Sequence, residues 1–577
     1  MNSPATVVNF EPRGGRRELA APHSPPALLT VEGLTIADRQ GRKLVRDVGF
    51  DVPLGGTIGI VGESGSGKSL TCRAVLGLLP AGLEVASGSI RYRNTDLLGL
   101  GERGWRKLRG VELSAVFQDP ASYLNPSIPV GRQLTEALRS TLGLDKRAAS
   151  ERAFHLLRSV GLADAETVYR QYPFELSGGM AQRVLIAIAV SAGPQLLIAD
   201  EATTALDATV QAEVLDLLDR LRRAQGLTLI LVSHDLAVVS QVCDHVIVMR
   251  DGAIVEAGPA ARVLGRPDHA YTRSLIDNHH RYGVEASGNP EERVAPLPGI
   301  TPAPTPAPVP LLQIRNLRAA YGNRAVLDGI DLHVERGEIL GVIGETGSGK
   351  TTILRSILGL VTPETGSINL EDQDLTLLRG KELRAFRRSA KVQYVFQDPL
   401  RSLDPDLPLG VSIGEGLDLT GRILPWQRDT RVIEALQAVG LDPALAGRLP
   451  RDLSGGQRQR TVLARALVLN PALLLMDEPV SALDSVNRIH VLQLMRQLAE
   501  ERGIAQIFIS HDLGSIAGVA DRVAVLHQGQ IVETGKAAAV LACPTHPYTR
   551  RLLESMPRLQ DGHAAAPHLA TFGIQEK

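Results

Sequence analysis

The chain contains the same series of short motifs twice, and this duplication constrains its fold more than any other feature. A glycine loop recurs at residues 62–69 and 344–351, followed in both copies by Phe-Gln-Asp-Pro, Leu-Ser-Gly-Gly, Asp-Glu and Ser-His-Asp-Leu segments. These lie at 117–120 and 396–399, 176–179 and 453–456, 200–201 and 477–478, and 233–236 and 510–513. The conserved order and nearly constant spacing predict two similar domains within the 577 residues.

A proline-rich stretch separates the two copies. Residues 296–310 contain seven prolines in 15 positions, a composition that favours extended polyproline II and cannot join a sheet or a helix. We therefore predict a linker at 285–310 between domains at 27–284 and 311–559, with a flexible N-terminus at 1–26 and a polar tail at 560–577.

Composition excludes several classes of protein. With 62 Lys+Arg and 63 Asp+Glu, the chain is not expected to bind nucleic acid through counterion release. Cys72, Cys243 and Cys543 form no CxxC pair, so we predict no disulfide framework or four-cysteine metal site, and a reducing compartment. Polar and proline residues interrupt the longest apolar stretch, 184–199, and residues 1–26 have no apolar core, so neither a membrane span nor a secretion signal is expected. We expect a soluble protein.

Apolar runs that end at polar loops predict an α/β fold in each copy. Buried strands are expected at 57–61, 195–199 and 227–232, and at 339–343, 473–476 and 506–509. Helices are expected after the glycine loops, at 69–79 and 351–360. Helical periodicity at 146–160 and 431–439 predicts a helical subdomain inserted in each copy.

The glycine loops fit the pattern G-x-x-x-x-G-K-[ST] between a strand and a helix, which is typical of P-loop NTPases. Their backbone N–H groups would cradle phosphates, Lys68 and Lys350 would reach the β and γ phosphates, and Ser69 and Thr351 would hold Mg²⁺. The candidate ATP-binding residues are Gly62, Ser64, Gly65, Gly67, Lys68 and Ser69, and Gly344, Thr346, Gly347, Gly349, Lys350, Thr351 and Thr352. A simple glycine turn could explain one loop but not two in register.

Acidic pairs close two of the predicted strands. Asp200 and Asp477 could anchor Mg²⁺, while the following Glu201 and Glu478 could polarise an attacking water. A histidine after an apolar strand is usually structural when it stands alone. The repetition of His234 and His511 within Ser-His-Asp-Leu instead favours contact with a γ phosphate.

Together these motifs resemble the ABC ATPase family over nearly all of both copies, and the Leu-Ser-Gly-Gly segments are the deciding feature. The resemblance implies tandem P-loop NTPase domains in which Gln118 and Gln397 join both the catalytic and the Mg²⁺ candidates. It also implies head-to-tail pairing, so that each ATP lies between one glycine loop and the signature of the other copy. The signature residues are Ser177, Gly178 and Gly179, and Ser454, Gly455 and Gly456.

Two departures from the family pattern distinguish the copies. The adenine-stacking aromatic is matched by Tyr321 in the second copy, whereas Asp38 stands at the corresponding position of the first. Met180 replaces the usual glutamine after the first signature, while Gln457 retains it in the second. Because both glutamates are present, we expect two hydrolytic sites of unequal affinity.

Finer features resemble the ATP-binding subunits of peptide and nickel importers. These are the extended segments 117–126 and 396–405 and the elements His269-Ala-Tyr-Thr-Arg273 and His546-Pro-Tyr-Thr-Arg550, whose histidines we interpret as structural. The resemblance implies two membrane permease subunits and an extracytoplasmic solute-binding protein as partners, at the cytoplasmic face of the membrane. Peptide import is the main hypothesis, and nickel or metal-chelate import stays open. Tandem ABC proteins that act on ribosomes are the alternative of another class, although their linkers are long, charged helices.

Overall fold

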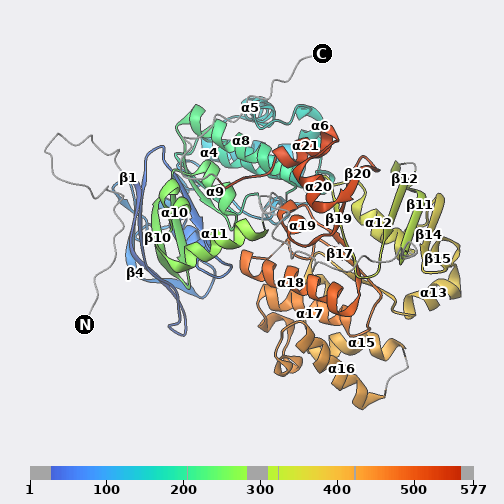
Figure 1. The fold of residues 1–577 in the computed structure, drawn as a ribbon. Helices are drawn as coiled ribbons and strands as arrows, with labels where there is room; N and C mark the ends of the chain where they lie inside the picture. The colour runs from blue at the N-terminus through green and yellow to red at the C-terminus, as the bar shows by residue number, and fades with distance from the viewer. Residues whose placement is uncertain are drawn as a thin grey trace. The chain divides into compact units, whose positions relative to one another are not determined.

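The computed structural model describes residues 27–203, 206–282, 310–322, 324–420, 424–481 and 483–559. The chain divides into two compact units, the first built mainly from residues up to Ile276 and the second mainly from Asp277–Met556 (Figure 1). The predicted N-terminal segment 1–26, the tail 560–577 and the linker, apart from Pro310, lie outside the described residues. The exact domain boundaries stay a prediction.

The first unit alternates strands and helices. Its strands are β1 (Ala27–Asp38), β2 (Lys43–Pro53), β3 (Thr57–Val61), β4 (Leu83–Tyr92), β5 (Thr95–Asp96), β6 (Leu113–Val116), β7 (Leu196–Asp200), β8 (Thr228–Val232), β9 (His245–Arg250) and β10 (Ala253–Pro259). Its helices are α1 (Lys68–Val75), α2 (Glu102–Leu108), α3 (Pro120–Tyr123), α4 (Val130–Leu142), α5 (Lys146–Ser159), α6 (Ala165–Arg170), α7 (Gly178–Val190), α8 (Ala208–Gln225), α9 (Leu236–Val242), α10 (Ala260–Gly265) and α11 (Ala270–Tyr282).

The second unit repeats this order from β11 to α21. Its strands are β11 (Leu312–Tyr321), β12 (Arg324–Val334), β13 (Ile339–Ile343), β14 (Thr365–Leu370), β15 (Gln373–Asp374), β16 (Val392–Val395), β17 (Leu473–Asp477), β18 (Ala505–Ile509), β19 (Arg522–His527) and β20 (Gln530–Lys536). Its helices are α12 (Lys350–Ile357), α13 (Gly380–Arg388), α14 (Pro399–Ser402), α15 (Leu409–Thr420), α16 (Pro425–Ala438), α17 (Gly455–Leu467), α18 (Ser485–Arg502), α19 (Leu513–Val519), α20 (Ala537–Ala542) and α21 (Pro547–Glu554).

Each unit contains a four-stranded antiparallel sheet and a six-stranded, mainly parallel sheet. The larger sheets have the orders β10-β9-β3-β8-β7-β6 and β20-β19-β13-β18-β17-β16. The strands β3, β7 and β8 are buried along their whole length, which explains their continuous apolar sequences. Because they are parallel, their carboxyl ends meet at one edge, where the glycine loop, the acidic pair and the histidine follow them.

A helical subdomain interrupts each unit, as the sequence predicted. In the second unit α15, α16 and α17 pack against one another, and Figure 1 shows this group beside α18. The helix α16 begins at Pro425, earlier than the periodicity indicated, because a proline is tolerated in the first helical turn. The helices after the glycine loops end earlier than predicted, at Val75 and Ile357, because Gly77 and Gly359 adopt positive φ angles of 62° and 64° just beyond them.

Buried aliphatic side chains form the cores of both units. One core in each unit lies between the six-stranded sheet and the helical subdomain, and another joins the same sheet to the antiparallel sheet. Among the described helices, none combines the length and apolar character needed to cross a bilayer.

Candidate active sites

The two glycine loops have backbone geometry that only glycine supports. Gly62 and Gly344 have φ angles of 148° and 152°. A Cβ atom at either position would lie 2.1 Å from a backbone carbonyl oxygen, that of Met249 for Gly62 and that of Leu526 for Gly344. The loops therefore press closely against the next strand of their own sheet, and each leads directly into a helix N-terminus. Such a loop can bring several N–H groups to one anion.

The loop lysines are held above these turns. The Nζ atom of Lys68 donates to the carbonyl oxygens of Gly62 and Glu63, both at 2.8 Å. Lys350 makes the equivalent bonds at 2.7 and 2.8 Å, and burial lowers its pKa. A bound phosphate would offset this desolvation, since it places negative charge beside a buried ammonium group.

Other loop residues divide into exposed and buried sets. Ser64 and Thr346 are exposed at the loop tips together with Gly65 and Gly347, whereas Thr352 is buried in α12. The Oγ atoms of Ser66 and Ser348 are buried and have no hydrogen-bond partner among the described residues. Because a buried hydroxyl usually has a hydrogen-bond partner, these two serines fit a loop that binds a polar group such as a phosphate.

Each loop hydroxyl contacts the aspartate at the end of a neighbouring strand. Ser69 Oγ donates to Asp200 Oδ1 at 2.9 Å, and Thr351 Oγ1 donates to Asp477 Oδ2 at 3.0 Å. Burial raises the pKa of Asp200, and its hydrogen bond with Ser69 partly offsets this. Hydroxyl and carboxylate oxygens are ligands that Mg²⁺ accepts, usually together with phosphate oxygens. The Ser69–Asp200 and Thr351–Asp477 pairs fit an Mg²⁺ ion whose other ligands are phosphate oxygens.

The second site has a tyrosine that the sequence analysis missed. The hydroxyl of Tyr394, on β16, donates to Asp477 Oδ2 at 2.7 Å, so that oxygen accepts from both Tyr394 and Thr351. Burial and the neighbouring carboxylate raise the pKa of Tyr394. The first copy has Ala115 at the corresponding place on β6. A position-by-position comparison of the two repeats could have found this difference.

The glutamate of the second site is tightly surrounded. His511 Nδ1 lies 3.2 Å from Glu478 Oε1, and Gln397 Nε2 donates to Glu478 Oε2 at 2.7 Å. Burial acts to raise the pKa of Glu478, but the hydrogen bond and charge of His511, with help from Lys350 and Gln397, lower it overall. Burial acts to lower the pKa of His511, but the hydrogen bond and charge of Glu478 have the larger effect, so the pKa of His511 is raised overall. The second site thus brings its predicted glutamine, glutamate and histidine together.

The first site has the same residue types, with a longer distance between histidine and glutamate. His234 Nδ1 lies 3.9 Å from Glu201 Oε1, and Gln118, two residues after β6, is exposed, as Gln397 is. Glu201 and Glu478 both follow their strands with positive φ angles, 52° and 50°. Both glutamates therefore follow their strands in a left-handed backbone conformation.

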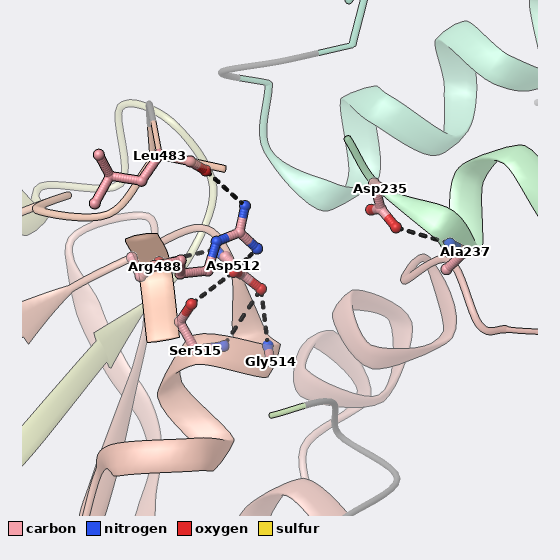
Figure 2. A network of polar contacts seen from close by, with 8 residues as sticks. Asp235, Ala237, Leu483, Arg488, Asp512, Gly514 and Ser515 are labelled. Atoms are coloured by element: carbon pink, nitrogen blue, oxygen red, sulfur yellow. Dashed lines mark hydrogen bonds and ion pairs between the residues drawn. The ribbon is translucent and has the colours of Figure 1, made fainter. Parts of the chain in front are cut away.

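The aspartate after each histidine caps a helix, and Figure 2 shows how the copies differ. Asp235 Oδ1 accepts from the backbone N–H of Ala237 at 2.9 Å at the start of α9. Asp512 caps α19 in the same way and also accepts from Ser515 Oγ at 2.6 Å and Arg488 Nη1 at 2.7 Å. In the first copy Gln211 and Val238 take the places of Arg488 and Ser515. The segment that carries His511 is therefore more firmly anchored.

The signature segments begin helices α7 and α17. The N-caps are Ser177 and Ser454, whose Oγ atoms each accept a backbone N–H at 3.3 Å. Gln457 closes a capping box by accepting from the Ser454 N–H at 3.0 Å, a bond that Met180 cannot make. These caps leave the N-terminal N–H groups of both helices available to an anion.

The signature glycines differ in their roles. Gly178 and Gly455 are exposed; a Cβ atom at Gly455 would meet nothing within 4 Å, and one at Gly178 would meet only Leu206, at 3.9 Å. A Cβ atom at Gly179 would lie 2.4 Å from Val210, and one at Gly456 would lie 2.2 Å from Asn487. The second glycine of each signature is therefore required for packing.

The predicted adenine-stacking positions also differ between copies. Tyr321, at the end of β11, has 47% of its surface exposed, and its side chain is hydrogen-bonded to Arg355 on α12. Asp38, at the end of β1, instead accepts the backbone N–H groups of Gln40 and Arg42, both at 2.9 Å. Its carboxylate closes a turn, so the first copy has a turn-forming residue where the second has an exposed aromatic ring.

The C-terminal helices of both units reach their glycine loops through a tyrosine. The hydroxyl of Tyr271 accepts the Glu63 N–H at 3.2 Å, and that of Tyr548 accepts the Glu345 N–H at 2.9 Å. His269 and His546 cap the same helices through Nδ1 and are structural, as predicted. The tyrosine contacts were not predicted, because they join segments about 200 residues apart.

Comparison with known families agrees with this geometry. The profile described as ABC transporter matches residues 45–204 and 327–481, which span both glycine loops and both acidic pairs. This chain belongs to the ABC transporter family. The ABC ATPase fold predicted from the sequence is confirmed, and the protein binds and hydrolyses ATP. A second profile, oligopeptide/dipeptide transporter, C-terminal region, matches residues 255–306 and 532–571 of this ABC ATPase.

Relatives match this ABC ATPase over most of its length. The glutathione import ATP-binding protein GsiA of Pectobacterium atrosepticum is 40% identical over 549 residues, which cover 90% of this chain and 88% of GsiA. The peptidoglycan transport ATP-binding protein YejF of Agrobacterium fabrum is 40% identical over 531 residues, which cover 91% of this chain and 96% of YejF. The solved structure of cbiO1 from Clostridium perfringens, part of the ABC transporter complex cbiONQ, is 28% identical and covers 41% of this chain and 91% of its own, with a TM-score of 0.38.

Proposed function

We propose that this ABC ATPase powers the import of peptides through separate membrane permease subunits, supplied by an extracytoplasmic solute-binding protein. The observation that carries the proposal is the oligopeptide/dipeptide transporter region matched in both halves. Full-length similarity to import proteins named for glutathione and for peptidoglycan supports it. The ATPase would act at the cytoplasmic face of the membrane, as a peripheral subunit without nucleic acid.

In the proposed mechanism, Lys68 and Lys350 bind the phosphates, and the loop N–H groups orient them for attack. The residues that would hold Mg²⁺ are Ser69, Asp200 and Gln118 in the first site, and Thr351, Asp477 and Gln397 in the second. When bound, the ion would neutralise charge that develops on the phosphates.

The glutamates would act on the attacking water. Glu478, kept ionised by its lowered pKa, accepts a proton from that water or orients it, and His511 holds the carboxylate in place. Glu201 and His234 take the same roles in the first site. The signature N–H groups of the other half would complete each phosphate cage on closure, so ATP would favour the closed state.

The test is to purify the assembly with its permeases and measure ATP turnover with different loads on the solute-binding protein. We expect a peptide-loaded protein to raise turnover several-fold and a nickel-loaded protein to leave it at the basal rate. The Glu201→Gln, Glu478→Gln double variant controls for contaminating ATPases. Stimulation by nickel alone, or recovery of the chain with ribosomes instead of permeases, would contradict the proposal.

A further inference from the structure

A cavity of about 390 Å³ lies in the second unit, away from the nucleotide-binding residues. Its walls are the end of α16 with the turn after it, the middle of α17 and one face of α18, three helices that neighbour one another in Figure 1. The polar side chains that line it include Arg460, His490, Gln497, Glu501 and Arg502. A volume of this size is typical of a site for a small molecule.

Arg460 is incompletely satisfied in this cavity. Its Nη1 atom donates to the carbonyl oxygen of Gly440 at 3.0 Å. Its Nε atom is buried and has no acceptor among the described residues. Burial lowers the pKa of Arg460, and no carboxylate in the described part of the chain offsets that loss. A half-buried guanidinium without an acidic partner favours an anion beside it.

The corresponding arginine of the first unit does have an acidic partner. Arg183 stands six residues after Ser177, as Arg460 stands six after Ser454. Arg183 Nη1 donates to the Val160 carbonyl oxygen at 2.8 Å, in the turn that corresponds to that of Arg460, although Arg460 bonds the next carbonyl, that of Gly440. Arg183 also forms an ion pair with Glu213 on α8, so it links three helical segments.

The second unit has a histidine at the position of this acidic partner. Glu213 lies twelve residues after Glu201, and the residue twelve positions after Glu478 is His490. Both units therefore have an arginine that bonds a carbonyl of this turn, but the position of the carboxylate has an imidazole in the second unit, where it lines the cavity. Substitution of one partner alone leaves an unbalanced charge, which is destabilising unless another group neutralises it.

We propose that this cavity binds a small molecule through a carboxylate or phosphate group that takes the place of the Glu213 side chain. Arg460, Arg502 and His490 would supply the donors, and the planar guanidinium suits an anion with two oxygens. The acidic residue of the lining, Glu501, accepts from Gln497 Nε2 at 3.0 Å. The bound group would join α16, α17 and α18 as the Arg183–Glu213 pair joins their counterparts.

The test is calorimetric titration of the full chain with inorganic phosphate and, separately, with acetate. Both nucleotide sites are first filled with Mg²⁺ and a non-hydrolysable ATP analogue, so that the glycine loops do not bind the probe. We expect saturable binding of at least one probe, and the preferred probe defines the headgroup chemistry. His490→Glu, which restores the ion pair of the first unit, should weaken this binding at least tenfold.

A matched pair of variants separates the site from general effects. Arg460→Gln should also abolish binding, whereas Arg183→Gln in the first unit should leave it unchanged. Thermal unfolding of each variant verifies that it is folded before titration. Because His490 is exposed, His490→Glu tests the proposal even if Arg460→Gln does not fold. Equal binding by the wild type and His490→Glu, or no saturable binding of either probe, would overturn the proposal.

Discussion

At the scale of single residues, the two sites differ in how firmly their carboxylates are held. Asp477 accepts hydrogen bonds from Thr351 and Tyr394, whereas Asp200 accepts one from Ser69, and the first copy has Ala115 at the position of Tyr394. Hydrogen bonds to a charged group are worth about 1.5–3 kcal/mol. The orientation of Asp477 should therefore depend on a hydroxyl that the first site does not have.

Tyr394→Phe should raise the Mg²⁺ concentration for half-maximal ATP turnover at the second site by roughly 3–10-fold, because Asp477 loses a bond that fixes its orientation. Turnover at saturating Mg²⁺ should change little. The measurement uses the Glu201→Gln background, in which the second site carries out hydrolysis. In the Glu478→Gln background the same Tyr394→Phe change should have no effect, and an equal shift in both backgrounds would refute a local role.

The Glu478–His511 pair predicts a pH-dependent stability. The pKa of His511 is raised in the folded state. Its contribution to the free energy of unfolding is therefore complete below its ordinary pKa of about 6.5 and is lost as the pH rises through the folded-state pKa. The pKa of Glu478 is lowered from its ordinary value of about 4.5. Its contribution to the free energy of unfolding is therefore lost only as the pH falls below that value.

We therefore expect the unfolding temperature of the wild type to exceed that of His511→Gln near pH 6, and the difference to shrink toward about pH 9. Thermal scans across this range provide the measurement. His234→Gln is the matched control, since His234 holds the same position in the first unit and lies 3.9 Å from its glutamate. A difference for His511→Gln that grows with pH would contradict the assigned shift.

Residue-level prediction from the sequence was strong for contacts along a motif and weak for contacts across the fold. The spacing identified Lys350, Thr351 and Asp477 because one loop and one strand end define them. Tyr394 and Tyr548 were missed, since each reaches its partner from a segment far away in the sequence. A local sequence pattern does not show which distant residue a tyrosine hydroxyl will contact in the folded chain.

At the scale of elements, the copies differ in how they start the signature helix. Gln457 and Ser454 form a reciprocal capping box on α17, and Met180 leaves α7 with the serine cap alone. Met180→Gln should stabilise the first unit by about 0.5 kcal/mol, because it satisfies one more backbone N–H.

For a unit of this size, that gain corresponds to a rise of about 1–2 °C in its unfolding temperature. Differential scanning calorimetry measures it, and Gln457→Met in the second unit should produce a fall of similar size. No change for Met180→Gln, together with a fall for Gln457→Met, would indicate that the first cap is already satisfied in another way.

For helices and strands too, the sequence predicted what a local apolar pattern determines and missed what the backbone geometry determines. The strand at Thr57–Val61 was predicted with its observed bounds, since a buried parallel strand has a continuous apolar sequence. The helix after it was predicted too long, because the range 69–79 continues past Gly77, whereas the helix ends at Val75. Its positive φ angle, which ends the helix, is set by backbone geometry that a hydrophobic pattern does not contain.

At the scale of the whole molecule, we expect ATP to fill the two nucleotide sites one after the other as its concentration rises. Tyr321 offers an exposed ring to an adenine, while the carboxylate of Asp38 is used in a turn. Base–aromatic stacking is worth about 1–3 kcal/mol, or roughly 5–150-fold in affinity. Equilibrium binding of a fluorescent ATP analogue should therefore show two classes of site in the intact chain.

Tyr321→Ala should weaken binding of the ATP analogue at the tighter site, so that the two sites have similar affinities. Tyr321→Phe should preserve the difference in affinity because the ring is retained. Asp38→Ala, which removes the turn carboxylate without adding a ring, is the control in the first unit. A single class of site in the wild type would show that adenine stacking does not distinguish the halves.

The left-handed backbone at Glu201 and Glu478 limits how this protein can change over evolutionary time. Asparagine, aspartate and glycine tolerate that conformation, whereas valine, isoleucine and threonine are strained by it. A descendant lineage that silences one of the two sites would therefore reach that state with least cost through a small set of replacements. A β-branched residue at position 201 or 478 in such a lineage would indicate that the backbone of this turn has changed its conformation.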